Sequence, residues 1–164
     1  MKKRHFQVST QIYVAIFWGL VAGFVAIHAI CKLQSLEEHT YEFTTDNFEI
    51  AQDGLSFSMS ASKSWTDDEL HTETPIGAQY DGVVTNNSNY LFQKWTVDLV
   101  FSEELTIDSY WNGDFKAEGN HVFFTAQGNP LSIDAGTQKT FGAVMYSREQ
   151  IATLESATLR GYLV

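Results

Sequence analysis

The 164-residue sequence contains one cysteine, Cys31, and two prolines. A single cysteine forms no intrachain disulfide, and it cannot supply a cysteine-based zinc site. The five histidines are scattered along the chain, and none stands at ligand spacing on one element with another. The sequence therefore predicts no bound metal and no cofactor.

Motifs of known catalytic machinery are also missing. The sequence has no G-x-S-x-G element, no glycine-rich phosphate loop and no H-E-x-x-H element. Carboxylates are abundant, and a glycosidase needs two of them across the scissile bond. The acidic clusters at 67–69 and 103–104 lie in polar, turn-like stretches, however, where solvated surface charge explains them. We therefore expect a protein that is not an enzyme.

Basic residues are scarce in most of the chain. All 20 acidic residues follow residue 36, and only six basic residues do, which gives that part a net charge of −14. Phosphate binding needs charge of the opposite sign. This composition excludes nucleic acids and anionic lipid surfaces as partners of the acidic part.

One long hydrophobic run is present near the N-terminus. Residues 12–30 contain no Asp, Glu, Lys or Arg, and as a helix they span roughly 28 Å, close to the hydrocarbon thickness of a bilayer. The basic residues 2–4 precede the run, which favours a cytoplasmic N-terminus. A cleavable signal peptide is the alternative. Its apolar core is normally shorter, and Ala29-Ile30-Cys31 is a poor cleavage site.

These observations predict how the chain is divided. We expect a cytoplasmic tail at 1–11, a transmembrane helix at 12–31, an irregular tether at 32–47 and an extracellular domain at 48–164. The protein is then a single-pass cell-membrane protein whose C-terminal domain lies outside the cell. His28 lies inside the span but near its outer end, where it reaches the interface.

The predicted extracellular domain consists of short strands separated by turns. In residues 94–101 Trp95, Val97, Leu99 and Phe101 share one face, and Thr96, Asp98 and Val100 share the other, which is typical of a half-buried strand. About eight strands are expected, with one helical turn within 148–154 and a strand at the C-terminus. Regular spacing of strands and turns predicts an all-β antiparallel sandwich, immunoglobulin-like or jelly-roll-like.

Two tryptophans have different predicted roles. Trp95 belongs to the apolar face of its strand and is expected in the core. Trp111 ends a strand and precedes the turn dipeptide Asn112-Gly113. At such a position the ring either covers the end of the core or lies flat against the apolar face of a sugar. The residues alone leave both interpretations open.

Several elements of the sequence share their order and spacing with a known family. They are V-T-N-N-S at 84–88, W-T-V-D-L-V-F at 95–101, I-D-S-Y-W-N-G at 107–113, L-S-I-D-A-G at 131–136 and T-F-G at 140–142. Together they resemble the family-2 carbohydrate-binding module, the bacterial cellulose-binding domain, over roughly residues 76–147. The resemblance implies an antiparallel β-sandwich that binds cellulose or xylan through surface aromatics and has no catalytic activity.

The resemblance also implies ligand-binding positions. Trp111 falls on one binding tryptophan of the family, whereas the other two aromatic positions fall at Asn129 and about Thr74. Trp65 takes the third role if the 66–75 loop is an insertion. Asp81 and Thr140 fall where the family places polar ligand contacts. Gly142 falls on the face that the family turns towards the sugar, and Phe141 is expected to point into the sandwich.

Two functions from different classes follow. The first is a membrane-anchored, non-catalytic module that binds a glucan or xylan, with Trp111, Trp65, Asp81, Asn129 and Thr140 as its ligand-binding residues. The alternative is a sensor or interaction ectodomain of a signalling or envelope protein. In that case the chain has kept the fold, has lost sugar binding and works with a protein partner in the membrane.

Overall fold

The computed structural model describes residues 21, 37–48, 51–67, 73–127 and 132–164. The chain divides into two compact units, Met1–Glu37 and Glu38–Val164. Apart from Val21, the predicted transmembrane helix lies outside the described residues. Within the residues that are described, no helix is both long enough and apolar enough to cross a membrane.

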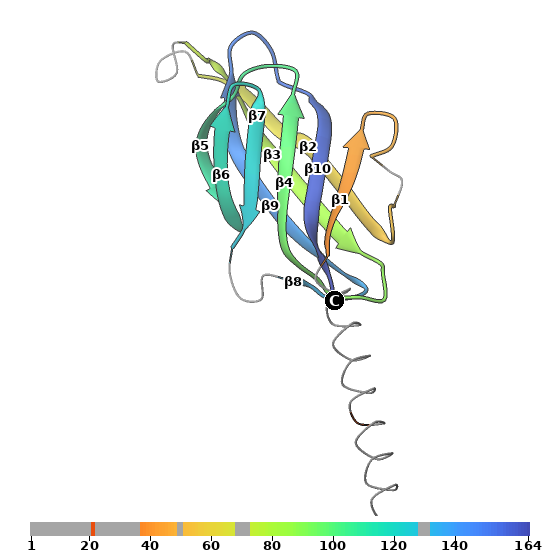
Figure 1. The fold of residues 1–164 in the computed structure, drawn as a ribbon. Helices are drawn as coiled ribbons and strands as arrows, with labels where there is room; N and C mark the ends of the chain where they lie inside the picture. Colours follow the sequence, from red (N-terminus) through yellow and green to blue (C-terminus); the bar gives the residue numbers. More distant parts are fainter. Residues whose placement is uncertain (1–20, 22–36, 49–50, 68–72, 128–131) are drawn as a thin grey trace, which may run out of the picture. The chain divides into compact units, whose positions relative to one another are not determined.

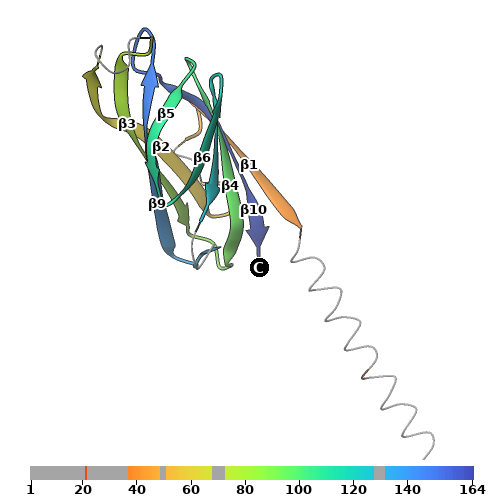
Figure 2. The same ribbon diagram turned by 90° about the vertical axis from the view of Figure 1, so that its left-hand side faces the viewer.

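The second unit consists of two antiparallel sheets (Figure 1). The six-stranded sheet has the order β1-β10-β4-β7-β6, with β8 beside β4, and the four-stranded sheet has the order β2-β3-β9-β5. The strands are β1 Glu38–Thr44, β2 Leu55–Thr66, β3 Ile76–Asn86, β4 Phe92–Phe101, β5 Thr106–Trp111, β6 Gly113–Glu118, β7 His121–Ala126, β8 Ser132–Ile133, β9 Thr137–Ser147 and β10 Leu154–Leu163. Figure 2 shows the two layers from the side. The predicted all-β antiparallel sandwich is confirmed.

Large aromatic side chains fill the space between the sheets. Trp95 on β4 is 4% exposed and Phe141 on β9 is 1% exposed, as predicted. Their ring centroids are 5.7 Å apart, and Phe124 of β7 stacks on Phe141 at 4.1 Å. Aromatic pairs of this kind contribute about 0.5–1.5 kcal/mol each beyond the area they bury. The two inner faces therefore hold each other in place and leave the outer faces free for other roles.

The strand β1 corrects the predicted tether at 32–47. Residues 38–44 pair with β10 along their whole length, and Tyr41 and Phe43 are buried. The segment E-H-T-Y-E-F-T carries only two large apolar residues and reads as polar. A strand nevertheless forms because β10 offers it a hydrogen-bonding edge and the core accepts its two rings.

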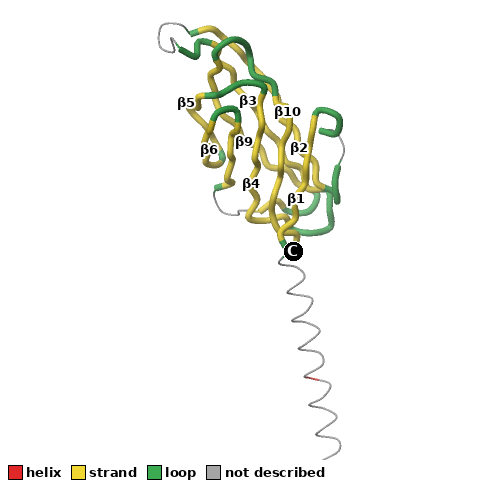
Figure 3. Tube along the Cα trace, turned by 45° about the horizontal axis from the view of Figure 1, so that its top comes forward, coloured by secondary structure: helices red, strands yellow, loops and turns green. Residues whose placement is uncertain are grey.

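The helical turn predicted within 148–154 is also wrong. Residues 148–153 form bends and loop between β9 and β10, and Leu154 already belongs to β10 (Figure 3). Here tertiary hydrogen bonds replace helical ones: the Ser102 amide donates to the Thr153 carbonyl at 2.9 Å, and the Ser102 hydroxyl accepts from the Thr153 amide at 3.0 Å. The described residues form ten strands rather than about eight.

A predicted turn directs β9 into the four-stranded sheet. Asp134-Ala135-Gly136 was expected as a tight turn, and Gly136 has a φ of +74°, which glycine adopts without steric cost. Its amide donates to the Asn86 carbonyl at 2.7 Å. Asn86 is fully buried, and its side-chain amide donates to the carbonyls of Tyr90 and Ile133, each at 2.8 Å. These bonds fix where β9 begins along β3.

Candidate functional site

The outer face of the four-stranded sheet brings together residues from all four strands. Directly paired residues in an antiparallel sheet project from the same face. One row across the sheet is Trp65, Gly77, Tyr146 and Thr106, and a second row is Ser60, Asp81, Gly142 and Trp111. We call the surface formed by these two rows, together with Gln79 and Thr140, the tryptophan face.

β-Bulges turn both tryptophans onto this face. In β2, Leu55 and Phe57 point inward, and simple alternation would turn Trp65 inward as well. A register shift between Ala61 and Lys63 inserts one extra residue, so that Trp65 points outward. In β5, a shift between Ile107 and Ser109 has the same effect on Trp111. Bulges commonly redirect a side chain in this way.

The ring of Trp111 lies over Gly142. A Cβ atom added at position 142 would lie 2.1 Å from Cζ2 of Trp111 and 2.4 Å from the carbonyl oxygen of Tyr80. No side chain fits there unless both the ring and the backbone at Tyr80 move, which explains why β9 has a glycine in its middle. The prediction that Phe141 enters the core is confirmed, and the strand pairing places Gly142 on the outer face.

Trp65 lies over Gly77 in a similar way. A Cβ atom at position 77 would lie 2.4 Å from Nε1 of Trp65. The indole N–H of Trp65 donates a hydrogen bond of 3.2 Å to the hydroxyl of Tyr146, and the two rings meet edge to face with centroids 6.0 Å apart. Trp65 remains 36% exposed. The neighbouring strands thus place both tryptophan rings against the sheet surface.

Polar groups lie close to the two rings. The side-chain amide of Gln79 donates to both carboxylate oxygens of Asp81, at 3.1 and 3.2 Å. Thr140 is exposed, and its carbonyl accepts a hydrogen bond of 3.0 Å from the side-chain amide of Asn112. Asn112 adopts a φ of +62° in the turn after Trp111. These donors and acceptors resemble the fixed polar groups that orient a ligand on an aromatic surface.

A hollow adjoins the tryptophan face at the Thr140 end. It has a volume of about 340 Å³ and is lined by Trp95, Asn112, Ala126, Gln127, Gln138, Lys139 and Thr140. The polar surface beside Trp111 therefore extends into this hollow through amide and hydroxyl side chains.

The tryptophan face is nearly uncharged although the domain is strongly acidic. Of the paired residues that point outward from this sheet, Lys63 and Asp81 are the charged ones. The described residues also contain no cluster of His, Cys, Asp and Glu that could hold a metal ion. A neutral ligand with both polar and apolar surface suits this face better than an ion.

The structure places four of the five predicted site residues on one face. Trp65, Asp81, Trp111 and Thr140 point outward from the four-stranded sheet. Asn129 lies outside the described residues. Thr74 precedes β3 and lines a separate hollow of about 620 Å³, together with acidic residues and Arg148.

Sequence reasoning missed Gly77, Gln79 and Tyr146. Gly77 had a detectable signal, because it stands inside the strand-like segment P-I-G-A-Q as Gly142 stands inside T-F-G-A-V. The roles of Gln79 and Tyr146 had no such signal, because they depend on which residues of β2 lie beside β3 and β9.

The comparison with protein families decides the classification. The family described as cellulose binding domain matches residues 69–163, more than half of the chain. The chain belongs to this family. Trp111, Asp81, Thr140 and Gly142 lie within the matched segment, whereas Trp65 precedes it. No curated protein matches the chain.

Solved structures with low identity also match this cellulose-binding domain chain. The chitin-binding domain of Chi18aC from Streptomyces coelicolor is 15% identical with a TM-score of 0.47, covering 64% of this chain and 91% of that one. The chitin-binding domain of a hyperthermophilic chitinase from Pyrococcus furiosus is 21% identical with a TM-score of 0.45, covering 68% and 92%. An exo-β-N-acetylglucosaminidase from Vibrio harveyi is 13% identical with a TM-score of 0.45, and the match covers 58% of this chain but 13% of that enzyme. These scores assign no ligand to the chain.

Proposed function

We propose that this chain is a non-catalytic, membrane-anchored module that binds a cellulose-like or xylan-like polysaccharide outside the cell. The observation that carries the proposal is the tryptophan face, where two tryptophans lie over glycines on one outer face of a cellulose-binding domain. Trp111, Trp65, Asp81 and Thr140 are its proposed ligand-binding residues. Asn129 remains a candidate from the sequence.

The chemistry of the face suits a β-linked sugar chain. Such a chain presents C–H groups on its ring faces and hydroxyls on its edges. A tryptophan ring buries the apolar ring face at low entropic cost, and nearby amides and carboxylates bind the hydroxyls. The near neutrality of the face avoids desolvating charge when such a ligand binds.

The spacing of the two tryptophans favours a long ligand. Trp65 and Trp111 lie three strands apart across the sheet, and their rows are four residues apart along β9. With strands about 4.8 Å apart and a rise of about 3.4 Å per residue, their Cα atoms are separated by roughly 20 Å. One ligand that contacts both rings is therefore a chain of several sugar units and not a single sugar.

The location is proposed from the sequence. Residues 12–31 form the anchor, with residues 1–11 in the cytoplasm and the sandwich outside, which places it where insoluble polysaccharides occur. A C-terminal alkaline phosphatase fusion tests this orientation. Enzyme activity in intact cells and recovery of the fusion in the membrane fraction are expected. A fusion that is inactive, or released to the medium, contradicts the proposed location.

Binding is tested with the full chain and a matched variant. The chain is purified in a detergent without a sugar headgroup and incubated with insoluble cellulose and insoluble xylan. We expect wild-type protein to be retained and Trp111→Ala to bind at least about tenfold more weakly, since it loses one aromatic contact. Because Trp111 lies on the outer face, the thermal midpoint should change little. If neither polysaccharide retains the wild-type protein, this result contradicts the proposed function and favours the interaction ectodomain.

A further inference from the structure

Tyr146 occupies an unusual position on the tryptophan face. It lies on β9 between Gly77 of β3 and Thr106 of β5, and its pairing places it on the outer side of the sheet. Its side chain is nevertheless only 5% exposed. The ring of Trp65 extends over Gly77 and reaches Tyr146, so a tyrosine on the solvent side is covered by the tryptophan of an edge strand.

The hydroxyl of Tyr146 fixes one edge of the Trp65 ring. It accepts the indole N–H at 3.2 Å, and the ring planes meet at 83°. At the same time, the missing side chain of Gly77 lets the indole approach the sheet backbone. With its N–H satisfied within the protein, Trp65 has its carbon surface left to offer a ligand.

Trp65 and the two residues that it contacts come from different parts of the sequence. Gly77 and Tyr146 lie within the family-matched segment 69–163, whereas Trp65 precedes it on β2. β2 is an edge strand, and most of its second half is exposed. Without additional contacts, an exposed tryptophan there would sample several rotamers, and ordering it on binding would cost conformational entropy.

We propose that Tyr146 is a positioning residue that holds Trp65 in its binding orientation, so that Trp65 acts as the second aromatic platform for the polysaccharide. This inference rests on the proposed function. Tyr146 acts through Trp65 and needs no contact with the sugar. Trp111 is placed differently, over Gly142, so a change at Tyr146 affects one platform and leaves the other intact.

The test uses Tyr146→Phe, which keeps the ring and removes the hydroxyl. Its control is Tyr80→Phe. This variant loses a hydroxyl on the core side of the same sheet, which donates a hydrogen bond of 2.8 Å to the Ala152 carbonyl. Because a hydrogen bond contributes about 0.5–1.5 kcal/mol, Tyr146→Phe should bind insoluble cellulose or xylan about two- to tenfold more weakly. Tyr80→Phe should lose stability but keep its affinity.

A second measurement needs no polysaccharide. The indole N–H resonances of full-length protein are recorded by NMR, and the Trp65 signal is assigned from its loss in Trp65→Phe. In Tyr146→Phe the Trp65 signal should shift and its hydrogen exchange should accelerate, while the Trp95 and Trp111 signals stay in place. If Tyr146 only stabilised the fold and did not position Trp65, this pattern would not appear.

The outcomes separate this inference from the proposed function. If the wild-type chain binds and Tyr146→Phe binds equally well, or if the Trp65 indole signal is unchanged, Tyr146 is not a positioning residue although the function stands. If the wild-type chain binds neither polysaccharide, the proposed function fails and the positioning role in binding fails with it. The indole spectra then still report whether Tyr146 orders Trp65.

Discussion

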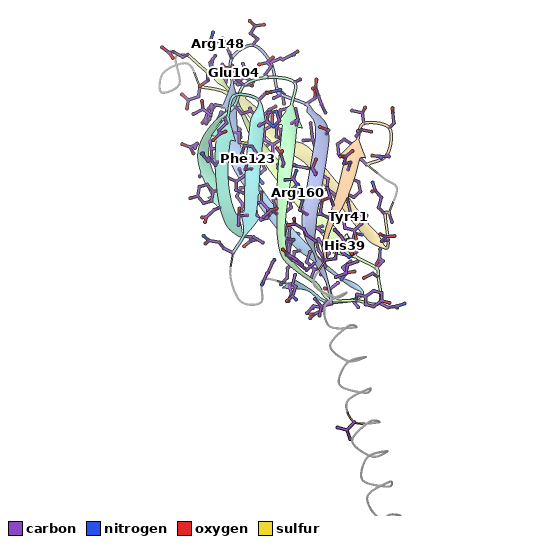
Figure 4. All side chains as sticks on the ribbon, in the orientation of Figure 1. His39, Tyr41, Glu104, Phe123, Arg148 and Arg160 are labelled. Atoms are coloured by element: carbon purple, nitrogen blue, oxygen red, sulfur yellow. The ribbon has the colours of Figure 1, made fainter. Side chains whose placement is uncertain are left out.

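The outer face of the four-stranded sheet carries two tryptophans and few charges, whereas the outer face of the six-stranded sheet is rich in charge. One row across the six-stranded sheet contains Lys116, Asp98 and Glu42, and another row contains Asp114 and Arg160. Phe123 is the large aromatic exposed there (Figure 4), with 36% of its surface accessible. Its ring stacks on that of His121. The same inner packing thus supports two chemically different surfaces.

The backbone shows how this difference arises. On the four-stranded sheet, two bulges turn tryptophans outward and two glycines leave room for their rings. On the six-stranded sheet, Gly161 has a different use, because a Cβ atom there would lie 2.5 Å from the ring of Phe92 in the core. Glycine within a strand therefore marks close packing on either side of a sheet, and only the pairing register tells which side.

Alkaline pH should have the largest effect on stability. It acts on a buried tyrosine in each of the two sheets. Burial raises the pKa of Tyr41 on β1 and of Tyr80 on β3 to about 12 from 10.0. Between pH 10 and pH 12 the folded chain keeps both protons while the unfolded chain loses them, so stability falls as the pH rises through this window. Two shifts of about two pKa units correspond to a loss of about 5 kcal/mol. Denaturant unfolding at pH 9, 10, 11 and 12 measures it.

Two variants divide this alkaline loss between the sheets. Tyr80→Phe removes a hydroxyl bonded to the Ala152 carbonyl and should cost about 1 kcal/mol at neutral pH. Within the described part of the chain the Tyr41 hydroxyl has no hydrogen-bond partner, so Tyr41→Phe should leave stability at neutral pH unchanged or raise it. Each variant should remove about half of the alkaline loss. Equal costs at neutral pH would contradict the difference between the two hydroxyls.

Gly142→Ala should have the next largest effect. The added methyl group would lie 2.1 Å from Trp111 and 2.4 Å from the Tyr80 carbonyl, so the ring must leave its place. Overpacking of this kind costs about 1–3 kcal/mol, and displacement of Trp111 should also weaken retention on cellulose, by no more than Trp111→Ala does. Thermal unfolding and a polysaccharide pull-down measure the two effects.

Gly161→Ala is the matched control on the six-stranded sheet. Its methyl group meets Phe92 inside the core, and it should destabilise the domain without changing polysaccharide binding once the protein is folded. Loss of affinity in this variant at a temperature well below its unfolding transition would show that binding depends on general stability and not on the tryptophan face.

The sequence predicts those parts of the molecule that follow simple alternation. Trp95 has a clear inward pattern, and it is in the core. The bulges break this alternation, and no local signal reveals them. Counting from Phe57, alternation turns Trp65 inward, and only the extra residue between Ala61 and Lys63 reverses it. Similarity to a family predicted Trp111 on the outer face where periodicity could not, and the pairing places it there.

Long-range pairing explains most of what the sequence did not predict. β1 forms because β10 offers it a free edge, although its own residues are mostly polar. Tyr146 meets Trp65 across 81 positions of sequence through the pairing of β2 with β3 and of β3 with β9. Local propensity carries no information about such contacts, which are determined by the register of the assembled sheet.

Phe123→Ala should have a small effect, and it tests the comparison directly. The variant removes the exposed aromatic of the six-stranded face and its stacking on His121, whose ring centroid is 6.0 Å away. Surface substitutions of this kind change stability by about 0.5 kcal/mol or less. Retention on cellulose should equal that of wild type. A loss comparable to that of Trp111→Ala would show that both outer faces bind polysaccharide.

Lys116→Met should have the smallest effect. On β6, the ammonium group of Lys116 donates a hydrogen bond to the exposed Glu118 carboxylate, and this bond, together with the positive charge, lowers the pKa of Glu118. A lowered pKa stabilises the fold above the ordinary pKa of the group, and this contribution is lost as the pH falls. In Lys116→Met the Glu118 pKa, followed by NMR titration, should rise towards its ordinary value, while the thermal midpoint at pH 7 stays unchanged because solvent screens exposed pairs. A clear fall in the midpoint would mean that the charges of the six-stranded face stabilise the sandwich. That face would then have a structural role to set beside the proposed binding role of the tryptophan face.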